Sequence, residues 1–80
     1  MRLDKYLKIS RLVKRRTLAK EIADKGRIDI NGRTAKSSTD VQVGDQITIH
    51  YGDKTVAVEV LQVLENVKKD AAADLYKNLD

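Results

Sequence analysis

The sequence predicts an α+β domain in which helices pack against one small antiparallel sheet. Apolar residues recur at helical spacing over residues 1–25, and after Gly26 they alternate with polar residues at a period of two. Turn-forming glycine pairs separate the alternating segments, and a final segment returns to helical spacing. The expected order is therefore two helices, four strands and a short C-terminal helix.

A first helix is expected over residues 2–9. Leu3, Tyr6 and Leu7 lie at the spacing that brings side chains to one face of a helix. The residues that follow, 10–14, lack this spacing, and we expect a turn there.

A second helix is expected over residues 15–25. Gly26 is a natural stop, because glycine readily adopts the left-handed conformation that ends many helices. The apolar face of this helix is predicted to consist of Leu18, Ala19, Ile22 and Ala23.

The middle of the chain predicts the sheet. Ile28 and Ile30 alternate with polar residues, and Asn31-Gly32 favours a tight turn with positive φ at both central positions. A polar loop is expected at residues 37–40. Two further strands are predicted from the alternating sets Ile47, Ile49 and Tyr51, then Val56, Val58 and Val60.

The C-terminal segment predicts a helix over residues 69–79. Ala71, Leu75 and Leu79 lie at i, i+4 and i+8 spacing within it. We therefore divide the chain into a main domain, residues 1–67, and a C-terminal helix or tail, residues 68–80.

Composition excludes several classes of protein. The 80 residues contain no cysteine, so disulfides and thiolate metal sites are ruled out. No apolar run approaches the roughly 20 residues of a membrane span, and we expect a cytoplasmic protein without a membrane partner. We expect neither a cofactor nor catalysis, because the one histidine, His50, is predicted to be exposed on a strand without convergent partners.

Charge is divided unequally along the chain. Residues 1–36 contain twelve Lys/Arg and four acidic residues, a formal charge of +8, whereas residues 37–80 carry −4. A strongly basic half in a small domain is typical of a protein with a polyanionic partner, usually a nucleic acid. Three tyrosines are the only aromatic residues. This favours folded RNA over single strands, which are usually bound by stacking bases on aromatic side chains.

The second predicted helix separates its charges by side. Arg16 and Lys20 lie at i, i+4 on one flank of the apolar face, and Glu21 and Asp24 lie on the other. The start of this helix exposes backbone N–H groups that favour a phosphate, and guanidinium groups add bidentate recognition. The alternative is that these charges only form a solvated face.

The N-terminal two-thirds resembles a known family, the S-four RNA-binding domain. The matching segments are RLDKYL at residues 2–7, SR at 10–11, KRRTLAKEIADKGRIDINGRTAK at 14–36 and VQVGDQI at 41–47. The complete order of these segments is specific, whereas a single Asn-Gly or Gly-Asp pair would be weak evidence.

The resemblance implies a fold, a function and partners. The implied fold packs N-terminal helices on a small antiparallel sheet. Small stand-alone members of the family bind large ribosomal subunits that are obstructed by a peptidyl-tRNA, and they contact large-subunit rRNA and the P-site tRNA. One kind acts in ribosome-associated quality control with the tailing factor RqcH, which extends stalled nascent chains with alanine. By this resemblance we expect a non-enzymatic, monomeric factor of that kind.

The resemblance also implies which residues contact RNA. These are Arg2, Arg11, Lys14, Arg15, Arg16, Thr17, Lys20 and Lys36. Asp4 matches a family position as well, and two roles remain open for it. It either orients a neighbouring arginine or complements the helix dipole as a first-turn acid.

Other functions remain open at the level of sequence. One is a ribosome recycling factor of the heat-shock kind found in the same family, and another is a module that targets a different RNA. A third is a small duplex-DNA binder whose second helix enters the major groove. The short helices and the hairpin that follows them argue against DNA binding.

Overall fold

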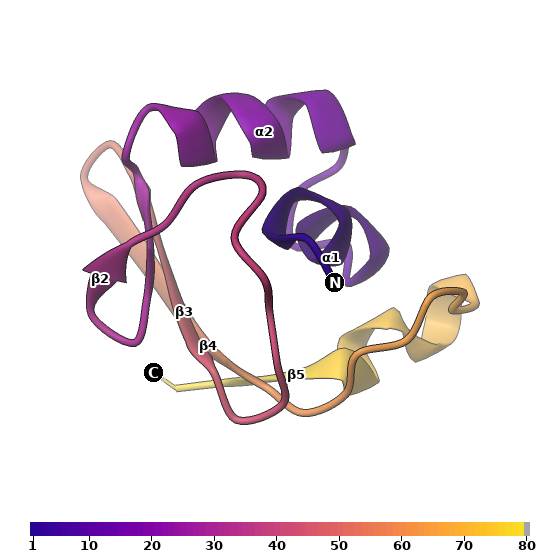
Figure 1. Ribbon diagram of the computed structural model, residues 1–80. Helices are drawn as coiled ribbons and strands as arrows, with labels where there is room; N and C mark the ends of the chain where they lie inside the picture. Colours follow the sequence, from indigo (N-terminus) through magenta and orange to yellow (C-terminus); the bar gives the residue numbers. More distant parts are fainter. Residues whose placement is uncertain (80) are drawn as a thin grey trace.

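The helices lie on one face of a five-stranded antiparallel sheet (Figure 1). The computed structural model describes residues 1–79. The sheet order is β2-β1-β3-β4-β5. The elements are α1 (Leu3–Ile9), α2 (Arg16–Asp24), β1 (Ile28–Ile30), β2 (Arg33–Thr34), β3 (Gln46–Tyr51), β4 (Lys54–Val60), the 3-10 helix η1 (Lys69–Leu75) and β5 (Tyr76–Asn78).

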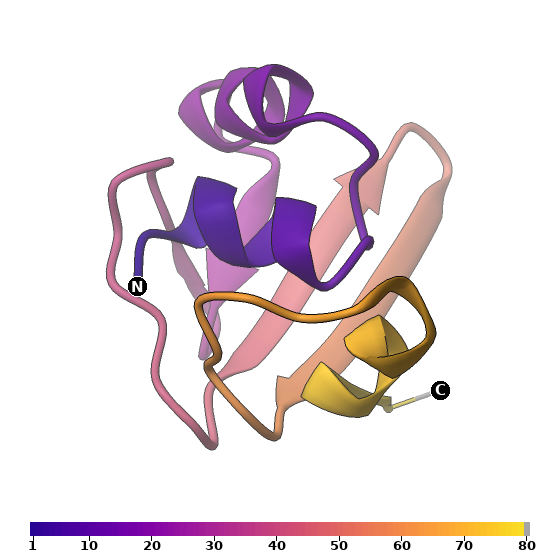
Figure 2. The same ribbon diagram turned by 90° about the vertical axis from the view of Figure 1, so that its right-hand side faces the viewer.

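The core lies between α1 and the sheet. Figure 2 shows α1 in front of the strands, with α2 on one side of it and η1 on the other. Leu3, Tyr6 and Leu7 of α1 are fully buried, as their helical spacing predicts. They meet alternate side chains of the strands, each of which stabilises the fold by about 1.5–3 kcal/mol through burial. These side chains are Ile28, Ile30, Ile47, Ile49, Val58 and Val60.

The predicted Asn31-Gly32 turn is confirmed. The φ angles are 54° at Asn31 and 82° at Gly32, so both central residues are left-handed. The turn joins β1 to β2 with Ile30 opposite Arg33. The side-chain oxygen Oδ1 of Asn31 also accepts a hydrogen bond from the Gln46 N–H at 2.9 Å, which connects the turn to the start of β3.

Residues 35–41 form a loop that runs beside the start of the chain. Leu3 donates its N–H to the Thr39 carbonyl at 2.8 Å, and Val41 donates to the Met1 carbonyl at 2.8 Å. The Asp24 carboxylate, at the end of α2, accepts the Ser37 N–H at 3.0 Å. The loop therefore connects the beginning of α1 to the end of α2.

The predicted helix over residues 69–79 is wrong in its second half. Residues Lys69–Leu75 form a 3-10 helix, but Tyr76–Asn78 form β5, which pairs with β4. The segment is shorter than the roughly 12–15 residues that an isolated helix needs, so tertiary contacts decide its structure. The carbonyl oxygen of the buried Leu75 accepts a hydrogen bond from the Tyr6 hydroxyl at 2.8 Å. The residues that follow Leu75, Tyr76–Asn78, pair with the open edge of β4.

Leu18 does not belong to the buried face of α2. It is 47% exposed, whereas Ala19 and Ala23 are fully buried and Ile22 is half-buried. Alanine is small, so α2 can pack closely through these two residues, and the larger Leu18 side chain lies beside the contact. None of the helices within residues 1–79 has the length and apolar run that a membrane crossing requires.

Candidate RNA-binding surface

A shallow depression of about 310 Å³ lies where the start of α1 meets α2. Four of the residues predicted to contact RNA line it, and the fifth lining residue is Asp4. The full set is Arg2, Asp4, Arg16, Thr17 and Lys20. Arg2 immediately precedes α1, Asp4 lies in its first turn and the other three belong to α2, so the packing of α1 against α2 brings them together.

Asp4 joins two arginines at this depression. Its carboxylate accepts hydrogen bonds from Nε and Nη2 of Arg2, each at 3.2 Å, and from Nη2 of Arg16 at 3.4 Å. The Lys5 N–H donates to the same carboxylate at 2.8 Å. Residues that are distant in the chain are thereby held as one charged cluster.

The Asp4 carboxylate stays ionised although it is buried. Burial alone would raise its pKa, but the hydrogen bonds from Arg2 and Arg16 outweigh burial and hold the pKa below its ordinary value. Its side chain is only 3% exposed, whereas those of Arg2 and Arg16 are 49% and 48% exposed. The negative charge is therefore hidden while the two positive charges face solvent.

This arrangement prepares the arginines to bind phosphate. Each guanidinium has five N–H donors, and Asp4 uses only some of them. The remaining donors can bind phosphate oxygens with little further loss of side-chain freedom, because the shared carboxylate already restrains both side chains. Asp4 also offsets the repulsion between the two cations.

Both roles left open for Asp4 are present in the structure. It is the acid in the first turn of α1, and it also orients two arginines. Sequence reasoning placed it outside the RNA-binding set. The sequence left open that Asp4 orients one arginine, and the structure adds that it joins Arg2 to Arg16.

Lys20 of α2 and Lys36 of the 35–41 loop extend the basic surface toward the end of α2. Hydrogen bonds from Ser37 lower the pKa of the Asp24 carboxyl most, and the charges of Lys20 and Lys36 lower it further. Both lysines therefore lie near Asp24. Lys36 belongs to the loop that Ser37 anchors to this carboxylate, which explains how a residue so distant in the chain reaches α2.

Lys14 and Arg15 lie at the start of α2. Both are exposed. Arg15 has an extended backbone, with φ −129° and ψ 138°, and its side chain does not cap the helix. Its long side chain is therefore free of the core, although its angular position on an ideal helix would fall within the apolar sector.

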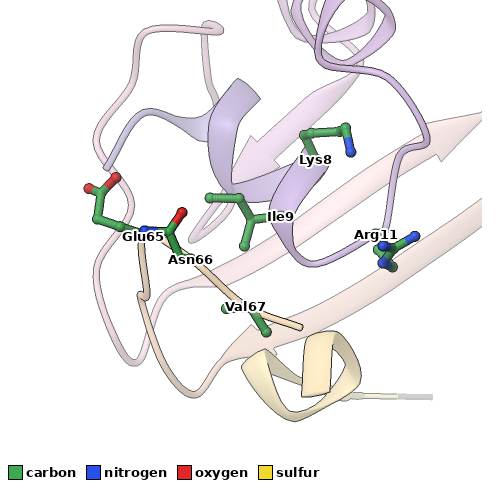
Figure 3. Close-up of a pocket in the computed structure, with 6 residues that line it drawn as sticks. All are labelled: Lys8, Ile9, Arg11, Glu65, Asn66 and Val67. Carbon is green, nitrogen blue, oxygen red and sulfur yellow. The ribbon is translucent and has the colours of Figure 1, made fainter. Parts of the chain in front are cut away.

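Arg11 lies apart from the other predicted residues. It lines a second depression at the far end of α1, together with Lys8 and with residues 65–67 (Figure 3). The structure thus brings Arg2, Arg16, Thr17 and Lys20 together and places Arg11 elsewhere.

His50 and Tyr6 have structural roles in the fold. The His50 side chain is exposed on β3, as predicted, and its Nε2 lies 3.0 Å from Oδ2 of Asp29. Tyr6 is buried in the core and is not available to stack on a base. Within residues 1–79, no group of three potential metal ligands comes together.

The fold and its surface define a small α+β domain of the RNA-binding class. Paired helices expose the arginines and lysines, and the sheet supports them from behind. The S4 domain family model matches residues 1–47, which is more than half of the chain. The chain therefore belongs to the S4 domain family, and the sequence-based assignment to the S-four RNA-binding domain is confirmed.

Individual relatives narrow the comparison. The chain is 58% identical over 77 residues to the "RQC P-site tRNA stabilizing factor" of Streptococcus pneumoniae, covering 96% of this chain and 88% of the relative. It is also 58% identical over 76 residues to the protein of the same name from Bacillus subtilis, covering 95% and 88%. The trimeric structure of Vibrio cholerae Heat Shock Protein 15 superposes with a TM-score of 0.88 at 32% identity, covering 98% of this chain and 80% of that one.

Proposed function

We propose that this protein is a non-enzymatic RNA-binding factor that acts on obstructed large ribosomal subunits in the cytoplasm. It contacts large-subunit rRNA and the P-site peptidyl-tRNA, and it supports the RqcH-dependent addition of alanine to stalled nascent chains. The observation that carries the proposal is the cluster of Arg2 and Arg16 around the buried Asp4 carboxylate. The names of relatives that are P-site tRNA stabilizing factors support P-site tRNA as one of its RNA partners.

The chemistry of the surface suits folded RNA. Guanidinium and ammonium groups bind phosphate oxygens, and their fixed spacing reads the path of the backbone rather than a base sequence. With about four to six phosphate contacts, a plot of the logarithm of the binding constant against the logarithm of the salt concentration should have a slope of roughly −3 to −5. A factor that binds in this way can hold a tRNA in position without taking part in a reaction.

Fractionation of a lysate tests the function. A tagged copy of the protein is followed through a sucrose gradient, and the RNA and proteins that purify with it are identified. Enrichment with free large subunits that carry peptidyl-tRNA and RqcH supports the proposal. Recovery only with small subunits, or away from ribosomes, would contradict it.

A recycling factor of the heat-shock kind is the second candidate. The close superposition on Vibrio cholerae Heat Shock Protein 15 favours it. Capture of RqcH with obstructed subunits distinguishes the two functions, because only the first proposal includes RqcH as a partner. We propose a monomer for this chain, in contrast to the trimer named for that relative, and sedimentation equilibrium tests this.

A further inference from the structure

Lys36 lies between two buried residues of the loop that follows β2. On one side, Ala35 donates its N–H to the Ile28 carbonyl of β1 at 2.8 Å, and on the other Ser37 is only 4% exposed. The Lys36 N–H donates to Oγ1 of Thr39 at 2.8 Å, and its carbonyl accepts the Thr39 N–H at 3.0 Å. The exposed side chain of Lys36 therefore extends from a backbone that is held in place on both sides.

Each polar group of Ser37 has a partner within the protein. Its N–H and its hydroxyl donate to the two carboxylate oxygens of Asp24, at 3.0 and 3.2 Å. Its carbonyl accepts the Asp4 N–H at 3.2 Å. Because a buried polar group costs stability unless it is hydrogen-bonded, these bonds determine where Ser37 lies. Ser37 thereby joins the end of α2 to the first turn of α1.

The Asp24 carboxylate does not pair directly with the lysines near it. Lys20 and Lys36 are close enough for their charges to lower the pKa of this carboxyl. Within the part of the chain that the structure describes, neither lysine forms an ion pair. Both carboxylate oxygens are instead engaged by Ser37, so the two ammonium groups remain available to phosphate.

The end of α2 gives no reason of its own for an acid at position 24. The C-terminus of a helix carries a partial negative charge, which disfavours a carboxylate there. Asp24 is the last residue of α2 and is exposed, so it does not contribute to the core either. What the acid contributes is its pair of hydrogen bonds to Ser37.

We propose that Asp24 and Ser37 are positioning residues for RNA binding, which fix the loop so that Lys36 is presented to phosphate close to Lys20. This inference rests on the proposed function and deepens it, because it gives a role to two residues outside the predicted RNA-binding set. Neither residue contacts RNA itself. Both act through Lys36, whose loop is already ordered before RNA binds and therefore loses little conformational freedom on binding.

Two substitutions of Asp24 that remove the same charge separate positioning from electrostatics. By net charge alone, Asp24→Ala and Asp24→Asn should strengthen binding equally. We expect Asp24→Ala to bind obstructed large subunits about fivefold more weakly than the wild type, because the loop loses its anchor. Asp24→Asn should restore most of the affinity, because its amide oxygen can accept the Ser37 N–H and its amide nitrogen can donate to the Ser37 hydroxyl.

A control and a measurement of folding accompany these variants. Glu21→Gln removes an acid elsewhere on α2, so it should bind as well as the wild type or better. Thermal melting should show that every variant is folded at the temperature of the binding assay. This is expected because the backbone bonds from Leu3 to Thr39 and from Val41 to Met1 still hold the loop.

A double-mutant cycle tests whether Asp24 acts through Lys36. Lys36→Ala should weaken binding about tenfold and make the slope of the salt dependence shallower by about one. Asp24→Ala combined with Lys36→Ala should bind within about twofold of Lys36→Ala, because a lysine that is absent cannot be positioned. Losses that multiply in the double variant would show that Asp24 acts independently of Lys36 and would overturn the inference.

Equal affinities of Asp24→Ala and Asp24→Asn, or wild-type affinity in Lys36→Ala, would also overturn it while leaving the proposed function intact. Failure of the wild type to bind obstructed subunits would instead count against the proposed function. In that case the same variants are compared on deproteinised large-subunit rRNA, where the same pattern is expected. Either of the two contrary results there, or no binding of that RNA by the wild type, would overturn the positioning role.

Discussion

Two regions of this molecule differ in how their charges are arranged: the helical surface, which is the exposed part of residues 1–36 on α1 and α2, and the sheet half, residues 37–80. Residues 1–36 carry a formal charge of +8, and their arginines and lysines face solvent around a buried acid. Residues 37–80 carry −4, and their acids lie mostly in turns and at the surface. The difference indicates that the helical surface is organised to bind a polyanion, whereas the sheet half supports the fold and repels phosphate.

The largest loss of binding affinity is expected when both arginines that contact Asp4 are removed. We expect Arg2→Ala combined with Arg16→Ala to weaken binding to obstructed large subunits about a hundredfold, because two charged hydrogen-bonding groups are removed. The salt slope should become shallower by about two. Filter binding or co-sedimentation over a range of salt concentrations measures both quantities.

The matched control for this variant is on the sheet half. Lys54→Ala combined with Lys77→Ala removes the same number of charges from exposed positions on β4 and β5. Its affinity should stay within about twofold of the wild type, because only charges near the phosphates release counterions. Equal losses in the two double variants would show that net charge, rather than the helical surface, determines binding.

Removal of the Asp4 charge distinguishes net charge from arginine positioning, because the two arguments predict opposite changes in binding affinity. By net charge alone, Asp4→Asn makes the surface more basic and should strengthen binding. We expect the affinity to fall about tenfold instead, because Arg2 and Arg16 lose the carboxylate that restrains them. Glu21→Gln removes the same charge from an exposed pair with Lys25, and it should bind as well as the wild type or better.

Acids that accept hydrogen bonds in the folded state should make the stability of the protein depend on pH. The pKa values of Asp4 and Asp24 are depressed below the ordinary value of 3.8 in the folded state. Such groups contribute stability above the unfolded-state pKa, and the contribution is lost as pH falls through the folded-state pKa. We therefore expect the free energy of unfolding to be maintained above about pH 4 and to fall below it.

Denaturant unfolding from pH 2 to pH 7 checks this expectation. Asp24→Asn should reduce the loss of stability below pH 4, because the variant has no carboxyl to protonate at that position. An exposed acid in a turn serves as the control, and Asp53→Asn between β3 and β4 should leave the dependence of stability on acid pH unchanged. Identical acid slopes in the wild type and Asp24→Asn would contradict the assignment.

Tyr6→Phe should produce the smallest effect and should separate stability from binding. The variant removes the hydroxyl that donates to the Leu75 carbonyl at 2.8 Å. That carbonyl keeps the Leu61 N–H at 2.8 Å, so the cost should be about 1 kcal/mol. The melting temperature should drop by a few degrees with RNA affinity unchanged, as calorimetry and co-sedimentation would show. A loss of affinity would mean that η1 influences the helical surface.

Sequence pattern predicts the elements of this fold that local spacing controls. The expected helix over residues 2–9 forms as Leu3–Ile9, and the one over 15–25 forms as Arg16–Asp24. The Asn31-Gly32 turn could be predicted as well, because the preference of these two residues for positive φ is a local property. The family resemblance could also be identified from the sequence, because it depends on the order of short segments along the chain and not on how they pack.

The parts that sequence did not predict depend on partners distant in the chain. Strand β5 exists because β4 offers a free edge, and no local pattern near Tyr76–Asn78 reports that edge. The exposure of Leu18 follows from close packing through Ala19. The joining of Arg2 to Arg16 needs the contact between α1 and α2. The sequence could therefore indicate that Asp4 orients one neighbouring arginine, but not that it links two.

Binding of the wild-type protein to large ribosomal subunits, with and without P-site peptidyl-tRNA, tests the central claim most directly when it is measured over a range of salt. We predict tighter binding to the obstructed subunits and a salt slope of roughly −3 to −5. Equal affinity for both kinds of subunit, or an affinity that does not change with salt, would contradict the account.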